Sequence, residues 1–163
     1  MMNISFKKMR ANDLEFLNRV RNEYSYEYLH DSRTFTLEET KNWYYTSNPE
    51  FWMIQLDSVN VGYFRISNHS KENKNLYIGA DIAKEYTGKG IAKEAYKQFI
   101  PHVFVIYSLN KITLEVLSTN KRAINLYNKL GFVLEGVKRQ EILKNGKWVD
   151  SIIMSLLKVE YKL

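Results

Sequence analysis

Apolar positions recur along the chain with two different spacings, and each spacing predicts a different element. Short apolar segments, some of them alternating with polar residues, predict strands at residues 4–9, 51–57, 59–68, 75–83, 111–118, 133–143 and 148–159. Apolar residues that recur every three to four positions predict helices at residues 12–25, 36–47, 88–100 and 120–132. Because helices are inserted between the later strands, we expect a mixed α/β sheet. No repeat or linker interrupts residues 1–163, which we interpret as one domain.

Polar residues and a glycine predict where several helices begin and end. Asn12 or Asp13 precedes an apolar helical pattern and is expected to cap that helix. Thr36 and Glu39 have the spacing of a capping box, in which each side chain bonds to the backbone amide of the other residue. Gly131 follows the last predicted helix, where a left-handed C-terminal cap is expected.

Turn and breaker residues complete the predicted layout. The polar run Lys71–Asn75 separates two apolar segments and predicts a hairpin loop. Asn145 and Gly146 lie between the last two strands, and this pair is a strong hairpin signal because both residues tolerate a positive φ. Pro101 falls inside the third helix, where it costs a hydrogen bond and is expected to produce a kink.

The composition limits the kinds of function. Of 163 residues, 45% are hydrophobic and 26% are charged, which is typical of a globular protein. The chain has no cysteine, which excludes disulfides, thiolate zinc sites and a cysteine nucleophile. No secretory signal is visible, and the longest apolar run, Phe99–Leu109, is too short to span a bilayer, so we expect a cytoplasmic protein without a membrane partner. The net charge of +6 favours nucleic acid, phosphorylated cofactors or anionic substrates as partners.

Gly88, Lys89 and Gly90 lie between a predicted strand and a predicted helix. A helix N-terminus exposes unpaired backbone amides with a partial positive charge, and glycines let an anion approach that backbone. The segment is therefore a candidate phosphate site, with a plain strand-to-helix turn as the alternative. Gly90 stands where a P-loop needs Ser or Thr, and the third glycine of a dinucleotide fingerprint is absent, so both of those motifs are excluded.

A second motif lies 32 residues further along the chain. Residues 120–132 have the form Asn-x2-Ala-x2-Leu-Tyr-x3-Gly-Phe. Together with the glycine segment, this motif resembles the GNAT superfamily of acetyl-CoA-dependent N-acetyltransferases. The motifs cover residues 76–132, and the predicted element order fits nearly the whole length. The resemblance implies the GNAT acyl-CoA N-acyltransferase fold, of class α/β (α+β): a mixed, mostly antiparallel sheet of about seven strands, flanked by about four helices and splayed between its fourth and fifth strands.

The resemblance also implies roles for individual residues toward acetyl-CoA, with no metal. The family's pyrophosphate loop, Gln/Arg-x-x-Gly-x-Gly/Ala, corresponds here to residues 85–90, with Glu85 in place of Gln or Arg. Binding should therefore rest on backbone amides and a lysine, within the set Thr87, Gly88, Lys89, Gly90, Ile91 and Ala92. Ile82 and Ala83 should offer backbone groups to the pantetheine and the thioester oxygen. Asn120 should bind the pantetheine arm.

Tyr127 should act as the general acid toward the departing sulfur, a role that suits a neutral phenol, with helix packing as the alternative. The general base is left open. Relatives often carry a glutamate where this chain has Tyr77, and a phenol with a pKa near 10 is a poor base. Asp81, Glu115, His30 and a water chain are the candidate substitutes. The two other histidines are interpreted as surface residues, His69 in a loop and His102 on a helix.

The first third of the chain should select the acceptor amine, as it does in relatives. Its layout resembles GNAT enzymes that act on nucleotide-linked amino sugars, of the type found in the pseudaminic acid pathway. The later strands also resemble spermidine and ribosomal-protein N-terminal acetyltransferases. The basic charge favours the nucleotide-linked amino sugar. Candidate acceptor-binding residues are Arg21, Tyr24, Tyr28, His30, Trp43 and Tyr77, with Arg33, Tyr44 and Arg65 as further candidates, and surface exposure or core packing is the alternative for each.

The expected function is therefore transfer of an acetyl group from acetyl-CoA to a primary amine by direct attack. A polyamine or a protein N-terminus is the alternative acceptor. Non-catalytic modules that bind acyl-CoA or nucleic acid form a different class of alternatives. A nucleic-acid partner is disfavoured, because no basic run with interleaved aromatic residues is present. A homodimer is possible, since the late strands commonly pair subunits in relatives.

Overall fold

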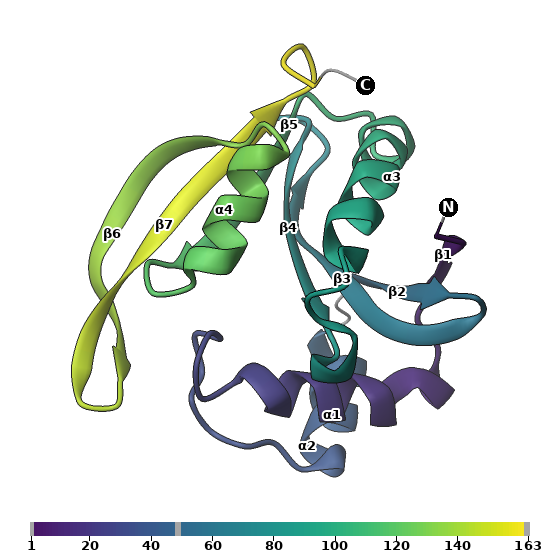
Figure 1. Ribbon diagram of the computed structural model, residues 1–163, viewed down its shortest axis with the longest axis vertical. Coiled ribbons are helices and arrows are strands. Elements are labelled where there is room, and N and C mark those ends of the chain that lie inside the picture. The colour runs from purple at the N-terminus through teal and green to yellow at the C-terminus, as the bar shows by residue number, and fades with distance from the viewer. Residues whose placement is uncertain (1, 48–49, 162–163) are drawn as a thin grey trace.

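One seven-stranded sheet carries the fold (Figure 1). The computed structural model describes residues 2–47 and 50–161. The strands are β1 (Ile4–Lys8), β2 (Glu50–Leu56), β3 (Val59–Ser70), β4 (Asn75–Ile82), β5 (Lys111–Leu117), β6 (Val133–Lys144) and β7 (Lys147–Leu157). They lie in the order β1-β2-β3-β4-β5-β7-β6, and only β4 and β5 pair in parallel. The expected mixed, mostly antiparallel sheet is confirmed.

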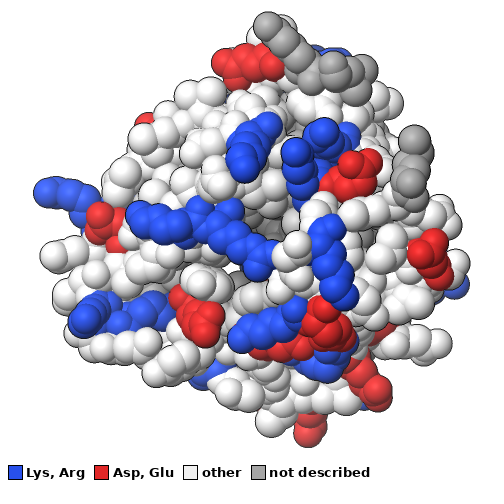
Figure 2. Space-filling view, viewed as in Figure 1, with Lys and Arg blue, Asp and Glu red and all other residues white. Residues whose placement is uncertain are grey.

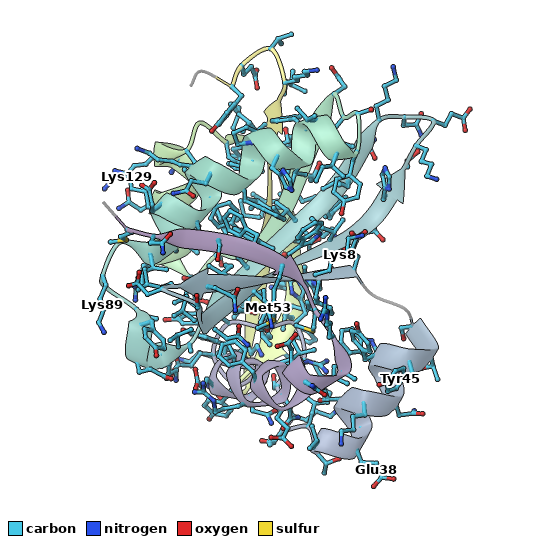
Figure 3. The ribbon with its side chains drawn as sticks, turned by 90° about the vertical axis from the view of Figure 1, so that its right-hand side faces the viewer. Lys8, Glu38, Tyr45, Met53, Lys89 and Lys129 are labelled. Carbon is cyan, nitrogen blue, oxygen red and sulfur yellow. The ribbon has the colours of Figure 1, made fainter. Side chains whose placement is uncertain are left out.

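Helices cover both faces of this sheet. They are α1 (Leu14–Tyr24), α2 (Leu37–Ser47), α3 (Ile91–Ile106) and α4 (Lys121–Lys129), with short 3-10 turns η1 (Ala11–Asp13) and η2 (Lys84–Tyr86). Neighbouring strand residues point to opposite faces, so Ile54 packs with α3 and α4 whereas Met53 packs with α1. Figure 3 shows Met53 between the sheet and α1. The result is three layers, with two hydrophobic clusters separated by the sheet.

The sheet splits between its fourth and fifth strands. β4 and β5 pair only over Asn75–Tyr77 and Lys111–Thr113, although β4 continues to Ile82 and β5 to Leu117. The two strands diverge beyond this point (Figure 1). The divergence confirms the expected splay, and it leaves one side of the β4 backbone without a strand partner.

Alternation along β4 decides which residues face this gap. The Ala83 amide donates to the Val61 carbonyl of β3 at 2.9 Å, and Ile82 lies opposite Gly62 in the next pair. Successive residues of a strand direct their backbone groups to opposite sides, so those of Ala80 and Ile82 point away from β3 and into the gap. Gly62 allows the close approach of the two strands, because a Cβ there would lie 2.5 Å from the Asp81 carbonyl.

Most of the predicted local signals are confirmed. The Thr36 amide donates to Glu39 at 2.7 Å and the Glu39 amide donates to Thr36 at 3.1 Å, which completes the capping box. Gly131 has a φ of 90° after α4. Asn145 and Gly146 have φ values of 51° and 72° in the turn that joins β6 to β7.

Three local predictions are wrong. Asp13 stands before α1 without a side-chain cap bond, because its carboxylate instead accepts from the Arg10 amide and the Lys7 ammonium, both at 3.0 Å. His69 belongs to β3 rather than to a loop, and its ring packs edge-on against Tyr107. The third helix does not end at residue 100 but continues to residue 106, although Pro101 lies inside it as expected.

Candidate active site

Two cavities meet at the gap in the sheet. The larger, of about 410 Å³, lies between the end of β4, the start of α3 and α4. The smaller, of about 120 Å³, lies between the sheet and the segment that runs from α1 to α2. The residues that line both cavities are Tyr28, Ala80, Asp81, Asn120 and Tyr127. A molecule in one cavity can therefore touch a molecule in the other at this junction.

The N-terminus of α3 forms the mouth of the larger cavity. Gly88 and Gly90 have φ values of 80° and 79°, a conformation that side-chain-bearing residues rarely adopt. No described side chain caps the helix at Gly90, and its first internal bond runs from the Glu94 amide to the Gly90 carbonyl at 3.1 Å. The amides before Glu94 therefore have no acceptor within the helix, and they form a place for an anion.

Basic side chains surround the larger cavity. Lys93 and Arg122 line it. Lys and Arg residues gather around the hollow in the middle of the face that Figure 2 shows. Lys89 instead points outward from its loop (Figure 3), with its ammonium 5.3 Å from the centre of the Tyr86 ring. Of the two glycines and the lysine in this loop, only the glycines line the cavity, so the backbone is the part of the loop that reaches it.

Glu85 does not leave an uncompensated negative charge at this loop. The Arg19 guanidinium of α1 lies 3.2 Å from both carboxylate oxygens of Glu85 and 3.0 Å from Glu23. A bond from its own backbone amide and the Arg19 guanidinium lower the pKa of the Glu85 carboxyl. Glu23 also accepts from the Lys84 amide at 2.8 Å, so α1 binds the first two residues of η2.

Other backbone groups expected to bind the cofactor are already paired. The Ala83 amide donates to Val61, and the Ala83 carbonyl accepts from the Tyr86 amide at 2.8 Å. The Ile82 carbonyl accepts from the Tyr24 hydroxyl. The structure therefore does not support the expected role of Ala83, and it leaves the Ile82 amide and the backbone of Ala80 facing the gap. Sequence reasoning missed Ala80, whose signal was its position two residues before Ile82 on the same strand.

Asn120 is placed by its own helix cap. Its Oδ1 accepts from the Ala123 amide at 3.2 Å at the start of α4, which leaves its Nδ2 group free to donate. Thr87 also makes a local bond, because its hydroxyl donates to the Lys84 carbonyl at 2.9 Å. Both residues line the larger cavity.

Tyr127 of α4 is buried at the junction of the two cavities. Its ring meets the Tyr96 ring edge-on at 5.7 Å between centroids and packs against Phe132 at 5.8 Å. Burial raises the pKa of the Tyr127 hydroxyl, the neighbouring Tyr96 hydroxyl lowers it by less, and the nearby Asp81 charge adds to the rise. The phenol is therefore fully protonated at neutral pH and able to donate a proton.

Asp81 of β4 faces Tyr127 across this junction. Its Oδ2 accepts from the Tyr63 hydroxyl at 2.8 Å. Burial raises the pKa of the Asp81 carboxyl, although the Tyr63 bond and the Arg65 charge act in the opposite direction. A carboxylate with a raised pKa is a stronger base than an exposed aspartate, so Asp81 is suited to accept a proton.

Glu115 has the opposite character. Its carboxylate accepts from the Ser151 hydroxyl at 2.7 Å and from the Lys138 ammonium at 2.9 Å, and the His30 ring nitrogen lies at 3.1 Å. Burial raises the pKa of the Glu115 carboxyl, but the bonds from Ser151, Lys138 and His30 lower it by more. Glu115 and His30 line only the smaller cavity, and the Glu115 carboxylate accepts from His30 Nε2 as well as from Ser151 and Lys138.

The chain is similar in sequence to a family of known proteins. The model of the acetyltransferase (GNAT) domain family matches residues 3–133. The chain belongs to the GNAT family. It is accordingly an acetyl-CoA-dependent N-acetyltransferase, and the gap in the sheet, the uncapped start of α3 and the larger cavity fit that cofactor.

Relatives of the GNAT protein act on different amines. It is 29% identical over 164 residues to the spermidine N(1)-acetyltransferase of Vibrio cholerae, covering 97% of this chain and 95% of that one. It is 32% identical over 106 residues to a putative ribosomal N-acetyltransferase, YdaF, of Bacillus subtilis, covering 65% and 58%. Among solved structures, spermidine N-acetyltransferase from Vibrio cholerae in complex with CoA and spermine matches with a TM-score of 0.89 at 24% identity, over 97% of both chains.

The smaller cavity of this GNAT domain contains some of the residues that were predicted to bind the acceptor. Arg21 and Trp43 line the smaller cavity, and the Arg21 guanidinium lies 4.9 Å from the centre of the Trp43 ring and 3.6 Å from that of Phe35. Burial lowers the pKa of Arg21. Arg65 lines the same cavity. Tyr63, which sequence reasoning missed, lines it as well because β3 turns this residue toward α1.

Other predicted acceptor residues lie elsewhere. Tyr77 lines neither cavity, because it pairs with Thr113 where β4 and β5 are still joined. Tyr44 packs in the core with its hydroxyl directed to the Met9 carbonyl at 3.4 Å. Arg33 is paired with Asp31 and Glu39 on the surface. Tyr24 lines the larger cavity rather than the smaller one.

The described part of the chain has neither a metal site of His, Cys, Asp or Glu side chains nor a membrane-spanning helix. Among residues 2–47 and 50–161, no group of three or more His, Cys, Asp or Glu side chains is arranged to hold a metal ion. Within the same residues, no helix has the length and apolar character needed to cross a membrane.

Proposed function

We propose that this protein transfers the acetyl group of acetyl-CoA to a primary amine of a polyamine such as spermidine. The observation that carries the proposal is the junction of two cavities at Asp81 and Tyr127, a residue suited to accept a proton and one suited to donate it. The nearly full-length similarity to a spermidine N(1)-acetyltransferase supports a polyamine as the acceptor. Asp81 and Glu115 both line the smaller cavity, where carboxylates attract a cationic amine.

The larger cavity is proposed to hold acetyl-CoA. The pyrophosphate lies against the free amides at the start of α3, where the helix dipole favours negative charge. The pantetheine arm extends along the gap in place of a strand, and it bonds to the backbone of Ala80 and to Asn120 Nδ2. The thioester then reaches the junction, beside the amine in the smaller cavity. Holding the two reactants in contact is itself a large part of catalysis.

Asp81 and Tyr127 then handle the protons. Asp81 removes a proton from the incoming ammonium, and the neutral nitrogen attacks the thioester carbon. The C–S bond breaks with its electron pair on sulfur, and Tyr127 transfers its hydroxyl proton to that sulfur. Positioned general acids and bases typically accelerate such steps by about 10²- to 10⁴-fold each. The positively charged nitrogen of the new amide loses its second proton to water, and the amide and the CoA thiol leave. Asp81 then returns its proton to water, and Tyr127 regains one from water.

One observation favours a second candidate acceptor. Arg21 and Arg65 line the smaller cavity, and neither forms an ion pair within the part of the chain that the structure describes. Two uncompensated guanidinium groups suit an acceptor that carries a phosphate or carboxylate next to its amine. A nucleotide-linked amino sugar has that chemistry, so it is the second candidate after a polyamine.

Release of CoA tests the proposal directly. Acetyl-CoA is offered with spermidine, spermine, a nucleotide-linked amino sugar or a peptide with a free N-terminus, and the thiol is detected with a chromogenic reagent. The protein has no cysteine, so every thiol signal comes from CoA. We expect release with spermidine. Release only with the amino sugar would replace the polyamine by the second candidate, and release only with the peptide would contradict both acceptor assignments.

Two variants test whether the junction performs the reaction. Tyr127→Phe should lower kcat by roughly 10²-fold or more, because the acid is lost, and should change the KM for acetyl-CoA little. Tyr44→Phe is the matched control, since that hydroxyl bonds to Met9 away from both cavities. An unchanged kcat in Tyr127→Phe would remove Tyr127 from the mechanism.

A further inference from the structure

Tyr96 of α3 carries a buried hydroxyl that has no hydrogen-bond partner in the described residues. Only 1% of the residue is exposed. Its ring packs edge-on against Phe64 at 4.9 Å between centroids, a contact that phenylalanine would make equally well. A buried polar group without a partner is destabilising, because it has lost its bonds to water and gained none in the protein. The hydroxyl therefore lowers the stability of this state of the protein without contributing to its packing.

The same hydroxyl lies beside Tyr127. The two rings meet edge-on, at 84° and 5.7 Å between centroids, and both residues line the larger cavity. Burial and the neighbouring Tyr127 raise the pKa of Tyr96, whereas the Tyr96 hydroxyl opposes the rise that burial causes in the pKa of Tyr127, which is the direction expected of a donor near that oxygen. No regular hydrogen bond joins them in this state. Tyr96 is thus a donor held next to Tyr127 and not engaged elsewhere.

Tyr127 needs a donor at one step of the proposed reaction. Once its proton has passed to sulfur, its oxygen carries a negative charge in a buried site that also contains Asp81. A buried phenolate is strongly disfavoured unless hydrogen bonds stabilise it. A hydrogen bond to a charged oxygen is about twice as strong as one between neutral groups, so a donor that is idle in the ground state stabilises the transition state selectively.

We propose that Tyr96 is a positioning residue for the acid, and that its hydroxyl donates a hydrogen bond to the Tyr127 oxygen as that oxygen loses its proton. The inference rests on the proposed function, in which Tyr127 protonates the leaving sulfur. The C–S electron pair goes to sulfur, the proton moves from Tyr127 to sulfur, and the negative charge that remains on Tyr127 is shared through the bond from Tyr96. Tyr96 keeps its own proton throughout.

The test is Tyr96→Phe, measured with acetyl-CoA and the amine that gives CoA release in the assay above. We expect kcat to fall roughly 10-fold or more, with the KM for acetyl-CoA unchanged, because only the charged oxygen uses the bond. The unfolding temperature should stay the same or rise, because a buried unpaired hydroxyl has been removed. Tyr107→Phe, one residue past the end of the same helix, is the matched control. Its hydroxyl bonds to Glu50 outside the site, so this variant should lose stability and keep kcat.

The double variant Tyr96→Phe/Tyr127→Phe separates this inference from the proposed function. We expect Tyr96→Phe to cost nothing further once Tyr127 is phenylalanine, because the two hydroxyls act as one unit. An unchanged kcat in Tyr96→Phe, an equal loss in both backgrounds, or a weaker acetyl-CoA interaction with normal kcat would each overturn the role of Tyr96 and leave Tyr127 as the acid. An unchanged kcat in Tyr127→Phe would instead overturn both.

Discussion

At the scale of single residues, Asp81 shows how the burial that suits a base also weakens the fold. The desolvation that raises the pKa of this carboxyl makes the ionised form unfavourable in the folded chain. The unfolded chain ionises near pH 4, whereas the folded chain ionises at higher pH. The contribution of Asp81 to the stability of the folded chain is therefore greatest below the unfolded pKa, and it falls as the pH rises toward the folded pKa.

Asp81→Asn should consequently raise the stability of the protein and lower its activity. At pH 7 we expect this variant to unfold at a higher temperature than the natural protein, with the difference vanishing below about pH 4, where both side chains are neutral. Its kcat should fall by about 10²-fold or more, because an amide cannot accept the amine's proton. Thermal unfolding at both pH values and CoA release at pH 7 check this. A lower unfolding temperature at pH 7 would show that the Tyr63 bond outweighs the desolvation.

At the scale of elements, the start of α3 depends on backbone conformation rather than on side chains. Gly90→Ala places a Cβ at a φ of 79°, which costs about 1–2 kcal/mol, although among the described residues only Met2 lies near the added atom. The loop should relax and turn its amides away from the phosphates, so the Kd for CoA should rise roughly 10-fold in calorimetry. Gly136→Ala is the matched control. It has open space around it and no positive φ, so CoA binding should be unchanged.

The elements themselves could be predicted because their signals are local. The capping box at Thr36, the turn at Asn145 and Gly146, and the glycines before α3 each encode a backbone conformation within a few residues. Pro101 was expected inside α3, but the distance over which α3 continues past it could not be predicted from such signals. Its later residues Val103 and Phe104 are buried against the sheet, and that packing outweighs the loss of one helix bond.

Contacts between distant segments of the chain could not be predicted from sequence patterns. Arg19 meets Glu85 across 66 positions of the chain, and Tyr24 meets Ile82 across 58. No spacing rule connects such residues, because only the fold brings α1 beside the end of β4. The sequence motifs predicted residues of the larger cavity. The smaller cavity contains residues that belong to no motif, such as Tyr63. Tyr77 was misplaced for the same reason.

At the scale of the whole molecule, one buried lysine ties the late hairpin to the acceptor cavity. Lys144, at the end of β6, is 6% exposed and donates to the Ser25 carbonyl at 2.6 Å. The segment that follows Ser25 contributes Tyr28 and His30 to the lining of the smaller cavity. The β6–β7 hairpin thereby supports a wall of the acceptor cavity without lining it.

Lys144→Met should therefore weaken the binding of the amine and leave the binding of CoA unchanged. Methionine retains most of the buried volume but cannot donate to Ser25, so the wall should loosen. We expect the KM for the amine to rise roughly 5-fold, equivalent to the loss of one ordinary hydrogen bond, with an unchanged Kd for CoA. Lys147→Met, an exposed position in the same hairpin, should change neither constant. A larger effect on CoA than on the amine would contradict this division of the molecule.

The short pairing of β4 with β5 has a consequence for the rates at which backbone hydrogens exchange with solvent. Only three residues of each strand hold the two parts of the sheet together, and the amides of Ala80 and Ile82 face the opening. Without a ligand these two amides should exchange quickly with heavy water, while that of Asp81, bound to β3, stays protected. Saturating CoA should slow the first two selectively. The bound CoA would then protect these two amides from exchange in the way that a neighbouring strand protects the amides of a sheet.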